Sequence, residues 1–195
     1  MADQLTDERL LAAAADGDTA AFQILYERYR DAIFRFTFRL LGSVEAAEDV
    51  THDCFLSLMK APGRFDPARA SLRTYIYAAA RNLATKRYHS FGRETAIDEL
   101  VEEPSVADRH GPMRLVLDHE LAGEVERAVS SLPRLLREAL VLFEYEDLSL
   151  AEIGAVVGAD SGTVKARLFR AREKLRARLG WYFRIGREAV TVKRA

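Results

Sequence analysis

The sequence predicts an all-α fold of two helical domains joined by an acidic flexible linker, with a helix-turn-helix in the C-terminal domain. Apolar residues recur at helical spacing along most of the 195 residues, and few segments alternate as strands do. This periodicity is lost between Glu94 and Pro112, where acidic residues dominate and Pro104 and Gly111 interrupt any helix. We therefore expect an N-terminal domain over residues 1–92, a linker over 93–114, a C-terminal four-helix domain over 115–180 and an extension over 181–195.

Two helices are predicted at the start of the chain. Residues 5–15 form a short helical pattern that ends at Asp16-Gly17-Asp18, where Asp18 or Thr19 can cap the next helix. The second helix extends to Leu41-Gly42 and carries a long apolar stripe formed by Phe22, Leu25, Tyr26, Tyr29, Ile33, Phe36 and Leu40. A stripe of this length is typical of a helix that faces a core.

A third helix, which Ser43 can cap, separates apolar from acidic side chains. Ala47, Val50, Cys54 and Leu58 are available for packing, and we expect the cysteine to be a buried thiol. Acidic residues gather on the opposite side, namely Glu45, Glu48, Asp49 and Asp53. Like charges one helical turn apart repel each other. This side is therefore either a solvated acidic face or a docking face for a basic protein surface.

The next helix has the opposite charge. It follows a break at Pro62-Gly63 and a turn at Phe65-Asp66-Pro67, and it runs from a cap at Ser71 to about His89. Residues 60–93 contain eight Lys or Arg and one acidic residue, interleaved with aromatic rings. Such a surface suits unpaired nucleic acid, because bases stack on rings while cations contact phosphates. Helical spacing assigns the buried stripe to Leu72, Tyr75, Ile76, Ala79 and Leu83.

Further breaks divide the C-terminal domain into helices. The helical pattern resumes near Leu115 and is interrupted at Ser131-Leu132-Pro133, and the following helix reaches Glu144. Ser149 can cap a short helix that Gly158 stops. The domain thus consists of two longer helices followed by a short one and the last, basic helix.

The last helix is strongly basic. Asp160 or Ser161 can cap it, and its apolar stripe consists of Val164, Leu168, Ala171 and Leu175. Residues 161–195 contain eleven Lys or Arg and two Glu, a concentration that is costly unless a polyanion or an acidic partner neutralises it. A short helix, a turn with glycine and a basic second helix are typical of the DNA-binding helix-turn-helix. A plain helical hairpin with a solvated face has the same pattern.

The composition excludes several classes of protein. A hydrophobic fraction of 49% excludes a disordered chain, and no membrane span or export signal is visible, which predicts a cytoplasmic protein. The single cysteine rules out an internal disulfide, and the four histidines show no metal-ligand spacing. We therefore assign no metal and no cofactor. Since we find no nucleophile–base pair and no Gly-rich phosphate loop, we also expect no enzymatic activity.

Four segments carry a resemblance to a known family. They are D-G-D-T-A-A-F-Q-I-L-Y-E-R-Y, A-E-D-V-T-H-D-C-F-L-S-L-M-K, F-D-P-A-R-A-S-L-R-T-Y-I-Y-A-A-A-R-N-L-A, and L-P-R-L-L-R-E-A-L-V-L-F with the helix-turn-helix that follows it. In this order they resemble the opening helix, the core-binding segment, the minus-ten-reading segment and the minus-thirty-five-reading domain of the extracytoplasmic-function (ECF) sigma factors of bacterial RNA polymerase. The resemblance covers residues 16–179 and implies core RNA polymerase and promoter DNA as partners.

The resemblance also implies site residues. Those that would face the basic coiled coil of the polymerase's largest subunit are Glu48, Asp49 and Asp53. Those that would contact the minus-ten element are Arg64, Phe65, Asn82, Lys86 and Arg87, with Asn82 at the base-flipping pocket. The loop over residues 63–70 would select the extruded base. Those that would contact the upstream element are Thr163, Lys165, Ala166, Arg167 and Arg170.

Two points stay open at the level of the sequence. Ala166 stands where a hydroxyl is common in the family, so the base preference at this position does not follow from the resemblance. An anti-sigma protein is the usual family partner, and nothing in the sequence itself identifies one. The competing hypothesis is a stand-alone helix-turn-helix regulator whose N-terminal half is a sensor or dimerisation domain. That hypothesis gives Asn82 and the aromatic-basic helix no role.

Overall fold

The computed structural model describes residues 5–91 and 112–192, and these residues are helical without any strand. The all-α prediction is therefore confirmed. Residues 93–111 of the predicted linker lie outside the described residues. The helices are α1 (Asp7–Ala15), α2 (Thr19–Leu41), α3 (Val44–Lys60), the 3-10 helix η2 (Pro62–Arg64), α4 (Leu72–Phe91), α5 (Pro112–Ser130), α6 (Arg134–Glu144), α7 (Leu150–Val157) and α8 (Ser161–Val192).

Short polar side chains and a glycine set the ends of the first helices, as predicted. Asp18 Oδ1 accepts hydrogen bonds from two N–H groups in the first turn of α2, at 2.9 and 3.1 Å. Gly42 ends α2 with φ 71°, a left-handed conformation that glycine adopts without strain. Ser43 Oγ then accepts a hydrogen bond from the first turn of α3 at 3.2 Å. These caps place α3 antiparallel to α2, against which it packs.

Helix α4 is buried on more sides than its sequence predicts. Leu72 and Ile76 are buried as expected, but three predicted positions, Tyr75, Ala79 and Leu83, are only partly buried. The ring of Tyr77 is instead 1% exposed, and it packs edge-on against Phe36 of α2 with 5.3 Å between ring centroids. The predicted single stripe is therefore partly wrong. The reason is that α2 and α3 contact α4 on one side while α7 contacts it on another.

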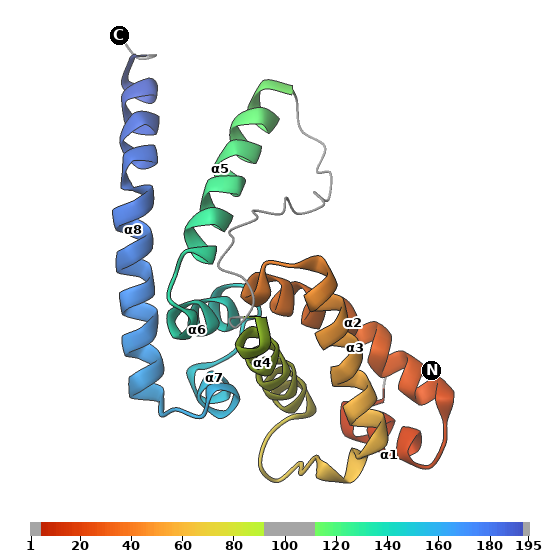
Figure 1. Ribbon diagram of the computed structural model, residues 1–195. Coiled ribbons are helices and arrows are strands. Elements are labelled where there is room, and N and C mark those ends of the chain that lie inside the picture. The colour runs from red at the N-terminus through yellow and green to blue at the C-terminus, as the bar shows by residue number, and fades with distance from the viewer. Residues whose placement is uncertain (1–4, 92–111, 193–195) are drawn as a thin grey trace.

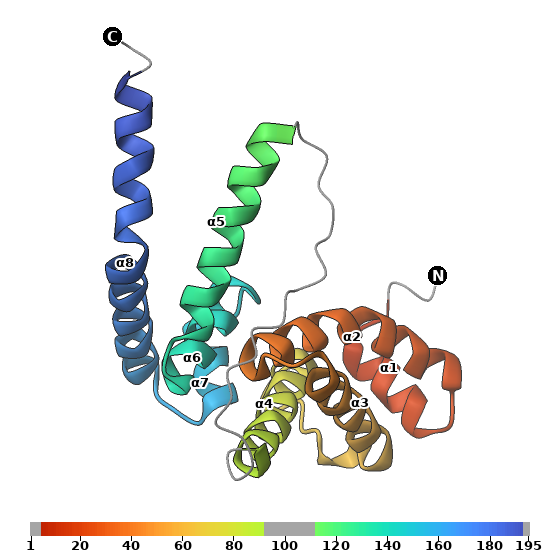
Figure 2. The same ribbon diagram turned by 45° about the horizontal axis from the view of Figure 1, so that its top comes forward.

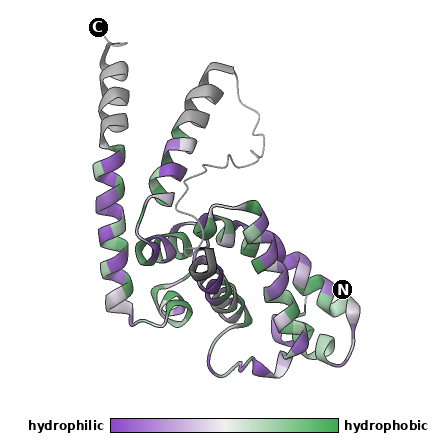
Figure 3. Ribbon diagram, in the orientation of Figure 1, coloured by the Kyte–Doolittle hydropathy of each residue, from purple (hydrophilic) through white to green (hydrophobic). Residues whose placement is uncertain are grey.

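The helix-turn-helix has the caps that the sequence predicts. Ser149 and Glu152 form a capping box, in which each side chain accepts a hydrogen bond from the other's backbone N–H, at 3.3 and 2.9 Å. Gly158 ends α7 with φ 67°. Asp160, one of the two predicted caps, accepts the N–H of Thr163 at 2.9 Å. Figure 3 colours most of α7 as hydrophobic, whereas α8 carries many hydrophilic residues.

Helix α8 continues past the predicted end of the C-terminal domain. It runs from Ser161 to Val192, so residues 181–192 of the predicted extension prolong the basic helix. At about 1.5 Å per residue this helix is roughly 48 Å long. Figures 1 and 2 show α8 and α5 projecting in the same direction from the other helices.

The helices before and after the undescribed segment pack against one another. Helix α4 contacts α7 and helix α2 contacts α6 (Figure 1), and the buried apolar residues of both sets belong to one cluster. Within residues 5–91 and 112–192, no helix is both long and apolar enough to cross a membrane.

Candidate nucleic-acid and protein interfaces

The acidic face of α3 is exposed, as the sequence predicts. Glu48, Asp49 and Asp53 all lie on the solvent side, while Ala47 and Val50 are buried against α2 and α4. The helix thus holds its carboxylates outward on a rigid element. A basic surface of a partner protein could contact all three without any change in the backbone of α3.

One of these carboxylates already has a basic neighbour within the chain. Arg87 of α4 forms an ion pair with Asp49, and both side chains are more than a third exposed. The structure therefore brings together a predicted polymerase-docking residue and a predicted DNA-binding residue. Because an exposed ion pair contributes only about 0–1 kcal/mol, either group can exchange its partner at small cost.

The cysteine of α3 is a core residue, as expected. Cys54 is buried, and its thiol lies 3.7 Å from the carbonyl oxygen of Ile76 in α4. Burial raises the pKa of the Cys54 thiol to about 12, so the reactive thiolate is scarce at neutral pH. The side chain therefore packs α3 against α4. Within the described residues, no group of His, Cys, Asp and Glu could hold a metal ion.

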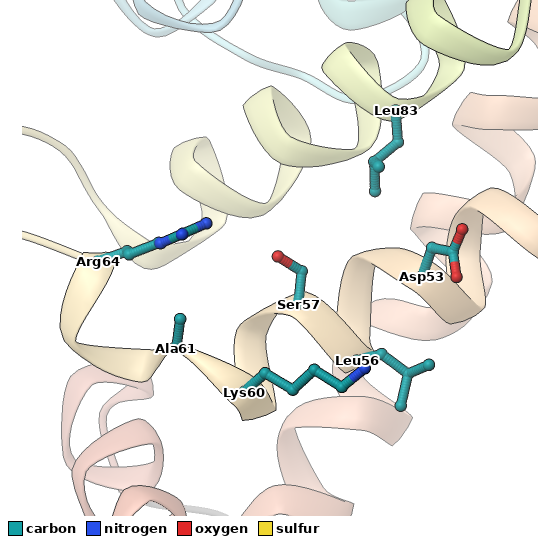
Figure 4. Close-up of a pocket in the computed structure, with 7 residues that line it drawn as sticks. All are labelled: Asp53, Leu56, Ser57, Lys60, Ala61, Arg64 and Leu83. Atoms are coloured by element: carbon teal, nitrogen blue, oxygen red, sulfur yellow. The ribbon is translucent and has the colours of Figure 1, made fainter.

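An open hollow of about 440 Å³ lies where α3, η2 and α4 meet (Figure 4). Leu83 points toward it from α4, Ser57 from α3 and Arg64 from η2 at one end. The other lining residues are Asp53, Leu56, Lys60 and Ala61. Arg64 is thus the one predicted minus-ten residue that lines the hollow. Asp53, which was predicted to dock the polymerase, also lines it.

The other predicted minus-ten residues do not line this hollow. Asn82 and Lys86 are exposed on α4, and Asn82 Oδ1 lies 3.5 Å from Nη1 of Arg81. Asn82 precedes Leu83 but is not among the residues that line the hollow. The ring of Phe65 is partly buried and packs on Tyr75 with 5.6 Å between ring centroids. Phe65 therefore anchors the loop between η2 and α4 to the core.

The first turns of α8 present a basic face. Lys165, Ala166 and Arg170 are exposed, while Arg167 is half-buried. Thr163 differs from them, because its hydroxyl donates a hydrogen bond to Asp160 Oδ2 at 2.6 Å and belongs to the helix cap. Three of the five predicted upstream residues are thus exposed on α8 without a role in its cap, whereas Nη1 of Arg167 is buried.

Sequence reasoning did not select Phe169 as a site residue. Its side chain is 64% exposed, the largest exposure of any bulky apolar residue described. It lies between Lys165 and Arg172, and with them it borders a second hollow of about 440 Å³ between α6, α7 and α8. Phe169 falls outside the apolar stripe of α8, and an aromatic residue outside the stripe of a basic helix is the signal that could have identified it.

The turn of the helix-turn-helix depends on a close backbone approach. A Cβ atom added at Gly154 of α7 would lie 2.5 Å from the carbonyl oxygen of Ala159. Only glycine fits at this position without a shift of the backbone. The close approach lets α8 leave α7 through a short turn, which fixes the direction in which the basic face of α8 points.

Both halves of the chain match models of known protein families. Residues 25–102 match the model of Sigma-70 region 2, and residues 122–175 match that of Sigma-70 region 4. The first match includes α3, the hollow and α4, and the second includes the helix-turn-helix. Together the two matches cover most of the chain, in the order that the sequence resemblance predicts.

Individual proteins are similar over nearly the whole length. The RNA polymerase sigma-H factor of Pseudomonas aeruginosa is 30% identical over 183 residues, which are 90% of this chain and 94% of that protein. The ECF RNA polymerase sigma factor SigW of Bacillus subtilis is 32% identical over 171 residues, 84% of this chain and 91% of that protein. Among solved structures, CnrH in complex with the cytosolic domain of CnrY matches with a TM-score of 0.67 and 27% identity, over 89% of this chain and 97% of CnrH.

Proposed function

The chain belongs to the ECF sigma factors of RNA polymerase. From this membership we propose which of its surfaces binds the polymerase and which bind each promoter element. As a sigma factor it directs transcription initiation, and a stand-alone regulator is excluded as its role. One observation carries the assignment of its surfaces. A single chain presents, in order, an exposed acidic helix, an aromatic-basic helix beside a hollow, and a basic helix-turn-helix.

The acidic face of α3 is the proposed docking site for core RNA polymerase. Glu48, Asp49 and Asp53 project from the same side of a helix that is held rigidly by α2 and α4. Carboxylates so arranged favour a basic partner surface, which removes the repulsion between them. Docking at Asp49 requires it to exchange Arg87 for a cation of the polymerase.

The hollow beside α4 is the proposed site for an unstacked base of the minus-ten element. Extruding a base costs a few kcal/mol, and a shaped pocket that accepts one base converts this cost into selectivity. Leu83 offers an apolar wall, while Arg64 and Ser57 offer hydrogen-bond donors. Lys86, exposed on the same helix, is placed to hold a phosphate of the melted strand.

The exposed face of α8 is the proposed reader of the upstream element. Arg170 and Lys165 can donate hydrogen bonds to base edges in the major groove. Ala166 and Phe169 have only apolar contacts to offer, which favours a thymine methyl group over a hydrogen-bonding edge. Thr163 is engaged in the cap, so we propose that it supports the helix terminus, where a phosphate can bind.

The same membership supports proposals about the regulation and location of the chain. We propose that a regulator of the anti-sigma class binds the free chain, in keeping with the relative CnrH, which was solved with the cytosolic domain of CnrY. We further propose that the chain performs no catalysis of its own and acts in the cytoplasm, where core polymerase and the chromosome are found.

The test is transcription with purified components. Core polymerase plus this chain should give run-off transcripts from promoters mapped after overexpression, and core polymerase alone should not. Asp49→Arg should abolish binding to core polymerase, because the acidic face then repels the partner surface. Glu27→Arg is the matched control, since Glu27 is an exposed acid of α2 outside that face. Equal core binding by the two variants would contradict the assignment of α3.

A further inference from the structure

The contact between the two sets of helices contains two buried carboxylates. Glu138 of α6 is 1% exposed, and Glu146, which follows α6, is 6% exposed. Burial of a carboxylate is costly unless cations or donors surround it. In both cases groups of the N-terminal helices do so, across the contact of α4 with the C-terminal helices (Figure 1), and Glu138 is also paired with Arg134 of its own helix at 3.0 Å.

Arginines of α2 and α4 supply the cations that reach these carboxylates from the N-terminal helices. Arg81 donates to Glu138 Oε2 from Nε at 3.2 Å and from Nη2 at 3.0 Å. Arg39 lies 3.9 Å from Glu146 Oε1, and Arg73 donates to the backbone carbonyl oxygen of Glu146. We call these three residues, Arg39, Arg73 and Arg81, the arginine face. Only 17% of the Arg81 side chain and 20% of the Arg39 side chain remain exposed.

The arginine face borders the proposed minus-ten surface. Arg73 and Arg81 lie two helical turns apart on α4, with Tyr77 between them, and the Tyr77 hydroxyl donates to Glu146. Asn82 follows Arg81 directly and lies within 3.5 Å of its guanidinium group. Guanidinium groups bind carboxylates and phosphates with the same two-pronged geometry. A carboxylate at Arg81 therefore stands where a phosphate oxygen could bind.

A permanent contact between the two halves would gain little from these charges. Replacing a buried ion pair with well-packed apolar side chains is often neutral or stabilising, so the pair itself is weak evidence for a stabilising role. A contact that opens exposes its arginines, which then need another anion to bind. DNA at the adjoining minus-ten surface would supply that anion, because it carries phosphates.

We propose that the arginine face is a binding surface for the phosphates of a DNA strand, and that Glu138 and Glu146 cover it in the closed chain. This inference rests on the proposed function, because it takes DNA to lie along α4. It adds three DNA-contacting residues that the sequence resemblance does not provide. It also gives the acidic residues of the C-terminal half the role of a displaceable cover.

The experiment breaks the same contact from either side. In the purified full-length chain, Glu138→Gln with Glu146→Gln leaves the arginines in place, whereas Arg73→Ala with Arg81→Ala removes two of them. The probe is a 20-nucleotide single-stranded DNA of unrelated sequence, titrated at several salt concentrations. The glutamine variant should bind more tightly than wild type. Its plot of log affinity against log salt should steepen by about 2, since each of three phosphate contacts adds roughly 0.7.

The alanine variant opens the same contact and should show no such gain. The matched control is Glu27→Gln with Glu124→Gln, which removes the same charge from two acids outside the contact. It should behave as wild type. Circular dichroism and thermal melting establish that each variant is folded.

Two results would overturn the inference. Equal gains in the glutamine and alanine variants would mean that opening exposes a different DNA-binding surface. The second test uses holoenzyme on promoter DNA and does not depend on the glutamine variant: Arg73→Ala with Arg81→Ala should reduce its salt slope, and an unchanged slope would exclude phosphate contacts by these arginines. Failure of the proposed function is seen separately, as absence of run-off transcription by the wild-type chain.

Discussion

Arg170 illustrates how a single side chain acquires its role from its neighbours. Val164, Leu168 and Ala171 are buried beneath α8, so the intervening positions must face outward. Arg170 and Lys165 are two of these exposed positions, and Phe169 lies between them in sequence. The buried stripe thus determines which cations can enter a major groove.

Arg170→Ala should weaken binding to a duplex that carries the upstream element by about 1 to 3 kcal/mol, because a base-edge contact is lost. Fluorescence anisotropy with the native and a scrambled element measures the change, which should be confined to the native sequence. Arg178→Ala removes an exposed arginine two turns further along α8 and is the matched control. If both variants weakened both duplexes equally, Arg170 would be a phosphate contact only.

At the scale of the element, the two caps of the helix-turn-helix fix the geometry of α7 and α8. Ser149 is hydrogen-bonded to Glu152, and Asp160 is hydrogen-bonded to Thr163. The hydrogen bond from the Ser149 hydroxyl lowers the pKa of Glu152, and that from the Thr163 hydroxyl lowers the pKa of Asp160. Both carboxylates therefore stabilise the fold in their ionised form.

Ser149→Ala should lower the free energy of unfolding by about 1 kcal/mol, the usual cost of losing such a cap. A lowered pKa means that Glu152 contributes its stabilisation above its ordinary pKa and loses it as pH falls through its folded value. The difference between wild type and Ser149→Ala should therefore be constant near pH 7 and shrink in strong acid. Urea unfolding at a series of pH values tests this. A difference that grows in acid would contradict the charged cap.

The helices and their caps could be predicted from the sequence because they depend on residues that are close together in the chain. Periodicity and caps identified the helices, because a helix end and its first turn lie within a few residues of each other. The same holds for the exposed acids of α3 and the basic face of α8. Tyr77 was not recognised as buried, since its neighbours Phe36 and Glu146 come from distant parts of the chain. Glu138 and Glu146 gave no sign of burial for the same reason: Arg81 and Arg39 precede them by more than fifty residues.

At the scale of the whole molecule, the contact between the N-terminal and C-terminal helices places the two proposed DNA-reading surfaces too close together to reach both promoter elements. Two elements centred near minus ten and minus thirty-five are separated by about 25 base pairs, or roughly 85 Å of duplex at about 3.4 Å per pair. In the free chain, by contrast, α4 contacts α7 of the helix-turn-helix directly. If α4 and the helix-turn-helix read these two elements as we propose, they must separate before both can be read.

A double-label measurement should detect this separation. Fluorophores on Asp31→Cys in α2 and Ala155→Cys in α7 use exposed positions, and the buried thiol of Cys54 should remain unlabelled. Energy transfer should be high in the free chain and fall when core polymerase and promoter DNA are added. A chain labelled at Asp31→Cys alone controls for changes in the dyes. Unchanged transfer in an active initiation complex would refute the opening.

The ion pair between Asp49 and Arg87 has a thermodynamic consequence for this assembly. Polymerase would compete with Arg87 for Asp49, and a DNA phosphate would compete with Asp49 for Arg87, so the pair has to be broken only once and the two binding events are coupled. Coupling of this kind is reciprocal: promoter DNA must raise the affinity of the chain for polymerase by the same factor by which polymerase raises its affinity for DNA. With an exposed pair worth about 1 kcal/mol at most, that factor is about fivefold or less. A modest cooperativity of assembly is thus built into one pair of surface charges.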